Sequence, residues 1–167
     1  MSAAVLGLGA NLGDSLAALQ GAVDALAQSE GITVTRSSAV YATDPVGGPE
    51  QPTFVNAVVL VETSLTPMQL LDRVHAIEAD WHRTREVRWG PRTLDIDIIV
   101  FDDVRSPDVQ LMLPHPRAAI RGFVLVPWLD ADPDAQLLGH DVRDLVKQVD
   151  TSGVRPLDPP LVLRVPA

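Results

Sequence analysis

Several residue types are absent or scarce in this sequence, and each shortage excludes a class of protein. There is no cysteine, which excludes a disulfide framework and a thiolate metal site. The 13 Lys and Arg residues are outnumbered by 22 Asp and Glu. The resulting net charge of −9 argues against nucleic acid as a partner, because a phosphate backbone attracts a basic surface. No apolar run approaches the ~20 residues of a membrane span.

The remaining composition is that of a soluble globular protein. Of the 167 residues, 46% are hydrophobic and 21% are charged, which predicts one domain over residues 1–167. Residues 1–14 lack a basic segment and their apolar part ends in a Gly/Asn turn, so no signal peptide is expected. We therefore expect a cytoplasmic protein with no membrane or nucleic-acid partner, and a monomer by default.

Hydrophobic periodicity predicts four strands and two helices in the first 101 residues. Their order is strand, helix, strand, strand, helix, strand, which is typical of an α+β fold of the ferredoxin-like sandwich type, with helices packed on an antiparallel sheet. The first helix is capped by Asp14 or Ser15, and the second starts with Thr66 as cap and Gln69 three residues later. The predicted strands are residues 3–9, 32–42, 54–62 and 93–101.

Beyond residue 101 the pattern is less regular. It predicts a strand over 124–129, an exposed turn at Asp130–Asp134 and a short helix near Asp141–Val149. Residues 150–167 are rich in proline, and we expect them to form an irregular, peripheral tail.

The stretch from Arg83 to Phe101 holds the most informative pattern. Asp95 and Asp97 lie two residues apart in a strand, so their side chains point to the same face. Two adjacent carboxylates suit Mg²⁺, which is usually held by one or two carboxylates together with substrate phosphates. Of the 13 basic residues, 4 lie just before the strand, and guanidinium groups pair with phosphate oxygens. These are Arg83, Arg85, Arg88 and Arg92.

Each of these residues also has a plain structural explanation. Arginine-rich loops are commonly solvated, and an Asp at a strand end is often a turn former. Glu78, Asp80 and His82 fit the exposed face of a helix end. Two other motifs fit poorly: residues 7–13 place the third glycine of a dinucleotide-binding turn one residue late, and residues 130–141 lack the Gly and Glu of a calcium loop.

Taken together, the motifs resemble 6-hydroxymethyl-7,8-dihydropterin pyrophosphokinase, a family of folate biosynthesis. The resemblance covers about residues 1–145, and its central signature runs from Arg88 to Ile99. Other matching segments follow in the same order along the chain: residues 9–13, 41–45, 51–57, 113–116 and 121–123.

The resemblance implies transfer of the pyrophosphoryl group of ATP to the hydroxymethyl group of the pterin, with two Mg²⁺ ions and small-molecule substrates only. It implies that Asp95 and Asp97 ligate the metal. The other roles that it implies are catalytic for Arg83 and Arg92, ATP-binding for Arg85, Arg88, Trp89, His115 and Arg121, and pterin-binding for Thr43, Val46, Phe54, Asn56 and Phe123.

Some of these positions retain another interpretation. Phe123 is equally suited to a core position, and Trp89 to a packing anchor. Asn56 is polar within the apolar run FVNAVVL and needs partners if it is buried. Two rival functions are a non-catalytic ligand-binding module and a kinase that forms ADP from another small alcohol.

Overall fold

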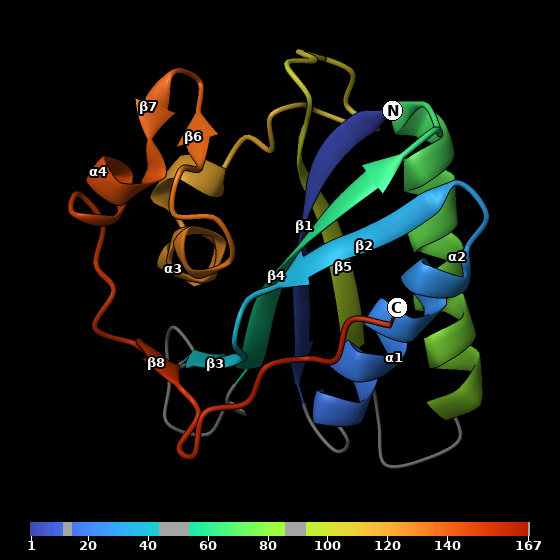
Figure 1. Ribbon diagram of the computed structural model, residues 1–167, viewed down its shortest axis with the longest axis horizontal. Coiled ribbons are helices and arrows are strands. Elements are labelled where there is room, and N and C mark those ends of the chain that lie inside the picture. Colours follow the sequence, from blue (N-terminus) through green and yellow to red (C-terminus); the bar gives the residue numbers. More distant parts are fainter. Residues whose placement is uncertain (12–14, 44–53, 86–92, 167) are drawn as a thin grey trace.

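The computed structural model describes residues 1–11, 15–43, 54–85 and 93–166, and the side chains of these except for residues 11, 82–85 and 93 (Figure 1). The first half of the chain contains β1 (Ser2–Asn11), α1 (Ser15–Gln28), β2 (Ile32–Ser37), β3 (Tyr41–Thr43), β4 (Phe54–Thr63), α2 (Pro67–Arg85) and β5 (Thr93–Phe101). The second half contains a 3-10 helix (Ala118–Ile120), α3 (Gly122–Ala131), β6 (Gln136–Leu137), β7 (His140–Asp141), α4 (Val142–Val146) and β8 (Val154–Pro156).

One antiparallel sheet forms the centre of the molecule. Its order begins β5-β1-β4, and β2 and β3 then pair with successive parts of β4. The last strand, β8, adds to the outer edge of β3. The predicted α+β class with an antiparallel sheet is therefore confirmed, and the predicted strand over 93–101 coincides with β5.

The single strand predicted over residues 32–42 is interrupted in the structure. Ser38 is buried between β2 and β3, where its N–H donates to Val58 O at 2.8 Å and its Oγ accepts from Val58 N–H at 2.9 Å. The side-chain hydroxyl thus replaces a backbone acceptor of the ladder. Residues 32–42 form two short strands because this serine takes part in the pairing through its side chain.

The two faces of the sheet are covered by different elements. Figure 1 shows α1 and α2 on one face, and α3, α4 and the β6–β7 hairpin on the other. Strand residues alternate between the two cores, so Leu6 and Leu8 pack under α1 and α2 while Val5 and Ile99 pack against α3. None of the described helices combines the length and the apolar character that a membrane span needs.

The strand predicted over residues 124–129 is wrong, because this run belongs to helix α3. Its buried residues include Val124, Leu125, Trp128 and Ala131, which recur at helical spacing. A short run that is apolar on nearly every position does not distinguish a buried strand from a buried helix. The packing between the sheet and α4 decides the conformation here.

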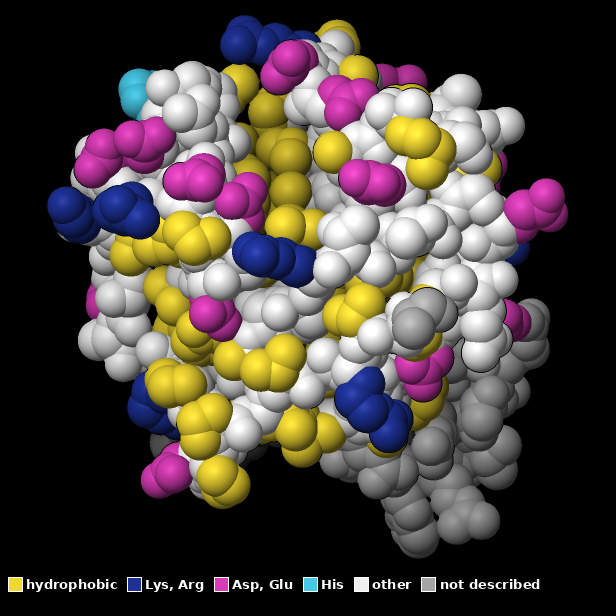
Figure 2. All heavy atoms as spheres, in the orientation of Figure 1, with side chains coloured by type: hydrophobic (Ala, Val, Ile, Leu, Met, Phe, Trp, Pro, Cys, Tyr) yellow, Lys and Arg dark blue, Asp and Glu magenta, His cyan; other side chains and the backbone are white. Residues whose placement is uncertain are grey.

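The exposed turn predicted at Asp130–Asp134 is confirmed in part, because Asp130 still belongs to α3 and the turn follows the end of that helix. Asp134 N–H donates to the Asp132 carboxylate at 3.0 Å, which is a local turn contact. Figure 2 shows acidic side chains gathered over β6, β7 and α4, with basic side chains among them. This part of the surface is therefore a mixed, solvated face.

The start of α2 is a capping box, as the sequence predicts. Thr66 N–H donates to Gln69 Oε1 at 2.9 Å, and Gln69 N–H donates to Thr66 Oγ1 at 3.2 Å. Each side chain thus satisfies a backbone donor that the first helical turn leaves unpaired. The box fixes where α2 begins, and α2 in turn runs along β5.

Most of the segment after residue 150 is irregular, as predicted, but the prediction that it is peripheral is wrong. Its residues 154–156 form β8 against β3, and Leu163 is buried with only 4% of its surface exposed. Gln20 of α1 donates to Arg164 O at 3.0 Å and accepts from Arg164 N–H at 2.9 Å. This segment therefore crosses the edge of the sheet and closes the core under α1.

Candidate active site

Asp95 and Asp97 lie on the edge strand β5 and point to the same face. Leu94, Ile96 and Ile98 are buried toward α1 and α2, whereas the two aspartates are exposed on the opposite face. The alternation expected from the sequence is confirmed. The acidic pair therefore faces the side of the sheet that carries α3, and solvent reaches both carboxylates.

Across the sheet, two glycines separate the acidic pair from β4. Asp95 pairs with Gly9 of β1, which pairs in turn with Asn56 of β4. Asp97 pairs with Gly7, one step further along the same strand. Because paired residues of an antiparallel sheet project to the same face, β1 contributes no side chain between Asn56 and Asp95.

Glu78 of α2 is a site neighbour that the sequence analysis assigned to an exposed helix face. Its carboxylate accepts a hydrogen bond of 2.8 Å from the backbone N–H of Ile96, the residue between the two aspartates. Burial raises the pKa of Glu78, and the charges of Asp95 and Asp97 raise it further. Glu78 follows the buried Val74 by four residues and therefore lies on the same face of α2. A carboxylate on that apolar face could have indicated, from the sequence alone, that Glu78 is not an ordinary exposed residue.

His115 is half-buried and lies close enough to Asp97 for the charge of that carboxylate to affect its pKa. Its backbone N–H donates to Ile99 O at 2.8 Å, which ties the segment to β5. Its Nδ1 accepts a hydrogen bond of 3.2 Å from Arg117 N–H. Burial lowers the pKa of His115, Arg121 and Arg117 lower it further, and Asp97 opposes them. The ring is therefore neutral at pH 7 with its proton on Nε2, which is left as a donor.

Arg121 and Phe123 form a pair at the start of α3. The guanidinium carbon of Arg121 lies 5.4 Å from the centroid of the Phe123 ring, a cation–π distance. Both side chains are half-buried rather than part of the closed core. The flat guanidinium and the ring are thus available on the face of the sheet that carries the acidic pair.

Asn56 and Thr43 meet where β3 pairs with β4. Asn56 is buried with 8% of its surface exposed, and its Oδ1 accepts a hydrogen bond of 2.7 Å from Thr43 Oγ1. Phe54, at the start of β4, pairs with Thr43 and projects to the same face as Asn56. These three side chains form the end of the site opposite the acidic pair.

Other predicted residues fall where the structure gives no side chains. Arg83 and Arg85 belong to the last turn of α2, but their side chains are not described. Val46, Arg88, Trp89 and Arg92 lie outside the described residues. The structure therefore brings together Thr43, Phe54 and Asn56 at one end, and Asp95, Asp97 and His115 at the other.

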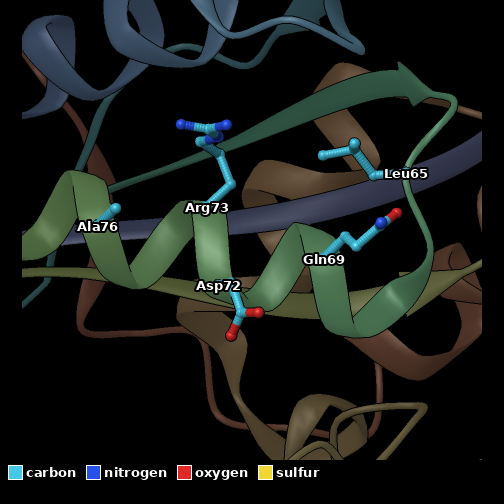
Figure 3. Close-up of a pocket in the computed structure, with 5 residues that line it drawn as sticks. All are labelled: Leu65, Gln69, Asp72, Arg73 and Ala76. Atoms are coloured by element: carbon cyan, nitrogen blue, oxygen red, sulfur yellow. The ribbon is translucent and has the colours of Figure 1, made fainter.

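A separate hollow of about 380 Å³ lies on the outer side of α2 and is lined by Leu65, Gln69, Asp72, Arg73 and Ala76 (Figure 3). Figure 3 shows Asp72 pointing away from the side on which Gln69 and Arg73 lie. Helix α2 covers the face of the sheet opposite to Asp95 and Asp97. The hollow is therefore unrelated to the acidic pair.

A comparison of the chain with known protein families gives a match that spans the site just described. Residues 5–133 match the family described as 7,8-dihydro-6-hydroxymethylpterin-pyrophosphokinase (HPPK). The chain belongs to the HPPK family. The matched range includes all of the residues that the structure places on the site face, and it confirms the family and the folate-pathway pyrophosphokinase predicted from the sequence.

Individual members of the HPPK family are similar over most of the chain. The chain is 45% identical to the 2-amino-4-hydroxy-6-hydroxymethyldihydropteridine pyrophosphokinase of Methylorubrum extorquens, over 92% of this chain and 98% of that protein. It is 48% identical to the Bacillus subtilis enzyme of the same name, over 74% of each chain.

A solved structure shares the fold of this chain at low sequence identity. The wild-type HPPK-DHPS of Plasmodium falciparum, solved with pteroate, superposes with a TM-score of 0.71 and 15% identity. The match covers 88% of this chain and 44% of that longer one. It supports the arrangement of the sheet and helices and nothing finer.

Proposed function

We propose that this chain is a Mg²⁺-dependent pyrophosphokinase that converts ATP and 6-hydroxymethyl-7,8-dihydropterin to AMP and the pterin diphosphate. The observation that carries the proposal is the placement of Asp95 and Asp97 on one exposed face, opposite the hydrogen-bonded Asn56. A reaction between these two substrates requires a site with one end that binds the phosphates of ATP and another end that binds the pterin.

The side chains of Asp95 and Asp97 are suitable ligands for Mg²⁺. Both side chains offer carboxylate oxygens, and Mg²⁺ prefers oxygen ligands while keeping positions for substrate phosphates. Within the described part of the chain, no group of three or more His, Asp or Glu is arranged to hold a metal. In this proposal Asp95 and Asp97 would hold two Mg²⁺ ions together with the triphosphate, and bound Mg²⁺ would neutralise phosphate charge during transfer.

The reaction exchanges one bond to phosphorus for another. The hydroxymethyl oxygen forms a bond to the β-phosphorus of ATP, the bond from that phosphorus to the α,β-bridging oxygen breaks, AMP leaves, and the hydroxyl proton passes to water. His115 donates from Nε2 toward the phosphates, because Nδ1 is already an acceptor. Arg121 lies beside it as a fixed cation.

The arginine-rich segment supplies further phosphate contacts in this proposal. Arg83 and Arg92 act on the transferring group, and Arg85, Arg88 and Trp89 contribute to ATP binding, as the family resemblance implies. Guanidinium groups suit this task because they form paired hydrogen bonds with phosphate oxygens.

The pterin occupies the other end of the face. Phe54 and Phe123 stack on the flat heterocycle, while Asn56 contacts its hydrogen-bonding edge. Thr43 and Val46 line the same pocket. The position of Phe54 on the face covered by α3, with Phe123 at the start of that helix, supports this pairing.

Three broader assignments complete the proposal. The sheet order β5-β1-β4-β2, antiparallel throughout, supports a ferredoxin-like core. We assign residues 1–167 to one pyrophosphokinase domain that acts as a monomer in the cytoplasm. Light scattering on the purified protein tests the monomer, and cell fractionation tests the location.

The decisive experiment is incubation with ATP, Mg²⁺ and 6-hydroxymethyl-7,8-dihydropterin, followed by separation of the nucleotides. The proposal predicts AMP in step with pterin diphosphate. Formation of ADP would indicate a kinase acting on a simple alcohol, and binding of both compounds without any product would indicate a binding module. Omission of Mg²⁺ with a chelator tests the metal, and AMP formation that survives it contradicts that part.

A further inference from the structure

The position of Gly9 beside Asn56 is not explained by its backbone. Among the described glycines, the positive φ angles are those of Gly31 and Gly139, so Gly9 has a conformation open to any residue. It lies within a regular strand that is paired on both sides, where a side chain normally adds packing. The reason for a glycine here must therefore be found in what occupies the space next to Gly9 on this face of the sheet.

That space is taken by the amide of Asn56. A Cβ built on Gly9 would stand 3.0 Å from Asn56 Nδ2, tighter than nine in ten real Cβ contacts, so the amide would have to shift. Gly7, two residues earlier on the same face, differs. A Cβ there would meet the Cδ1 of Ile99 at 3.4 Å, which is the movable end of an apolar side chain. Of the two glycines on this face of β1, Gly9 is the one whose Cβ would meet a polar group.

Thr43 forms a hydrogen bond with the other end of the same Asn56 amide. Its hydroxyl donates to Asn56 Oδ1 at 2.7 Å, so the carbonyl oxygen lies on the Thr43 side of the amide and Nδ2 lies on the Gly9 side. An amide held in this way presents donors, not acceptors, on that side.

The strand that carries Thr43 is itself held firmly. Asp130 of α3 accepts a hydrogen bond of 2.8 Å from Ala39 N–H, and it also pairs with the hydroxyl of Tyr41. On its outer edge Thr43 pairs with Val154 of β8. The hydroxyl of Thr43 is therefore held in position and can orient the Asn56 amide.

We propose that Gly9 and Thr43 are positioning residues that hold the Asn56 amide from two sides, so that Nδ2 donates to a hydrogen-bond acceptor of the bound heterocycle. Thr43 determines which end of the amide faces the ligand, and the absence of a side chain at Gly9 leaves space for Nδ2 at that end. The inference rests on the proposed function, because it assumes that Asn56 contacts the pterin. A ligand that offers a donor at this point is selected against, since two donors would then face each other.

The test compares Gly9→Ala with Gly7→Ala as its matched control. Binding of the pterin is measured by calorimetry in the presence of a non-hydrolysable ATP analogue, and binding of the analogue is measured separately. We expect Gly9→Ala to weaken pterin binding by about tenfold or more, the size of one misplaced hydrogen bond, with analogue binding unchanged. Gly7→Ala should leave both affinities within about twofold of the wild type.

A second background isolates the role of the amide. In Asn56→Ala the group that Gly9 accommodates is gone, so adding Gly9→Ala should cause no further loss of pterin affinity. A separate pair tests Thr43 and remains informative if Gly9→Ala does not fold: Thr43→Ser keeps the hydroxyl and should bind like the wild type, whereas Thr43→Val should lose about tenfold.

The outcomes separate the inference from the function on which it rests. An equal loss from Gly9→Ala with and without the Asn56 amide, or equal affinity of Thr43→Val and Thr43→Ser, would overturn the inference. Loss of analogue binding together with pterin binding in Gly9→Ala would do the same, because it indicates a general disturbance of the sheet. If instead Asn56→Ala binds pterin normally, or the wild type forms no AMP, the proposed function itself fails.

Discussion

The carboxylate of Glu78 accepts the backbone N–H of Ile96 at 2.8 Å, at the one residue that lies between Asp95 and Asp97. Strand β5 has β1 on one side only in the order of the sheet, so a helix side chain satisfies a donor on its outer edge. The same contact places a third carboxylate near the acidic pair. Its pKa is raised, first by burial and then by the charges of the two aspartates.

Glu78→Gln should increase stability at high pH and not at low pH. A raised pKa means that the folded state favours the protonated carboxyl, so the stability from Glu78 is full below the ordinary value of 4.5 and declines as pH rises through the folded value. Glutamine keeps an acceptor for Ile96 and carries no charge. Urea unfolding at pH 8 should favour the variant, and the difference should close toward pH 4.

The control for this prediction is Glu62→Gln, which changes an exposed glutamate of β4. Its effect on the unfolding free energy should be small at each pH. If Glu78→Gln is less stable than the wild type at both ends of the range, the ionised carboxylate stabilises the strand and the stated direction is wrong.

Asp95→Ala and Asp97→Ala should each abolish AMP formation while the fold persists. Both side chains are exposed, so little packing is lost, whereas the loss of a metal ligand should lower turnover by at least about a thousandfold. Turnover and the melting temperature are the two measurements. Asp103→Ala, an exposed aspartate just after β5, is the control and should be fully active. Wild-type turnover in either site variant would contradict the metal assignment.

His115→Ala should raise the KM for ATP by about tenfold, the value of one hydrogen bond to a charged group. Burial lowers the pKa of His115 below its ordinary 6.5, so the ring is neutral above that pH and donates from Nε2. The ratio of KM between variant and wild type should therefore stay constant from pH 7 to pH 9. His140→Ala on the β6–β7 hairpin serves as the control. A ratio that falls steadily across this range would mean that the charged ring is the active form.

The same lowered pKa predicts how His115 affects stability. The unfolded chain binds the proton more readily than the folded one, so stability is fully present above pH 6.5 and is lost as pH falls from there. Urea unfolding of the wild type and of His115→Ala at pH 7.5 and pH 5.5 measures this. The wild type should lose more stability over the interval than the variant, and equal losses would exclude this role for the histidine.

Leu163→Ala should lower the free energy of unfolding by about 2–4 kcal/mol, the usual cost of a cavity in a closed core. Leu163 has 4% of its surface exposed and belongs to the core under α1. The neighbouring Val162 is 56% exposed, so Val162→Ala should change stability by no more than about 0.5 kcal/mol. Equal, small effects from both variants would mean that the segment after residue 150 is loosely attached.

Local patterns in the sequence were sufficient for much of the fold. The strand over 93–101 and the capping box at Thr66 and Gln69 match the structure, because alternation and capping depend on residues a few positions apart. The polar Asn56 within an apolar run marked a position that needed a partner, and Thr43 provides it.

The wrong predictions have a common cause. Residues 124–129 are apolar in a way that suits both a strand and a helix, and Ser38 interrupts a strand by pairing with Val58. Glu78 was assigned to solvent, although it contacts Ile96 across 18 positions. In each case the partner that decides the conformation is distant in the sequence.

By itself, the sequence determined the family, the succession of elements and the residue types available for chemistry, since motif spacing and periodicity are written in neighbouring positions. Only the tertiary structure decided that Gly9 stands between Asn56 and Asp95, that burial keeps His115 neutral, and that Arg164 reaches Gln20 across 144 positions. The physical reason is that proximity, burial and charge environment arise when distant segments pack together, and no local pattern encodes which segments those are.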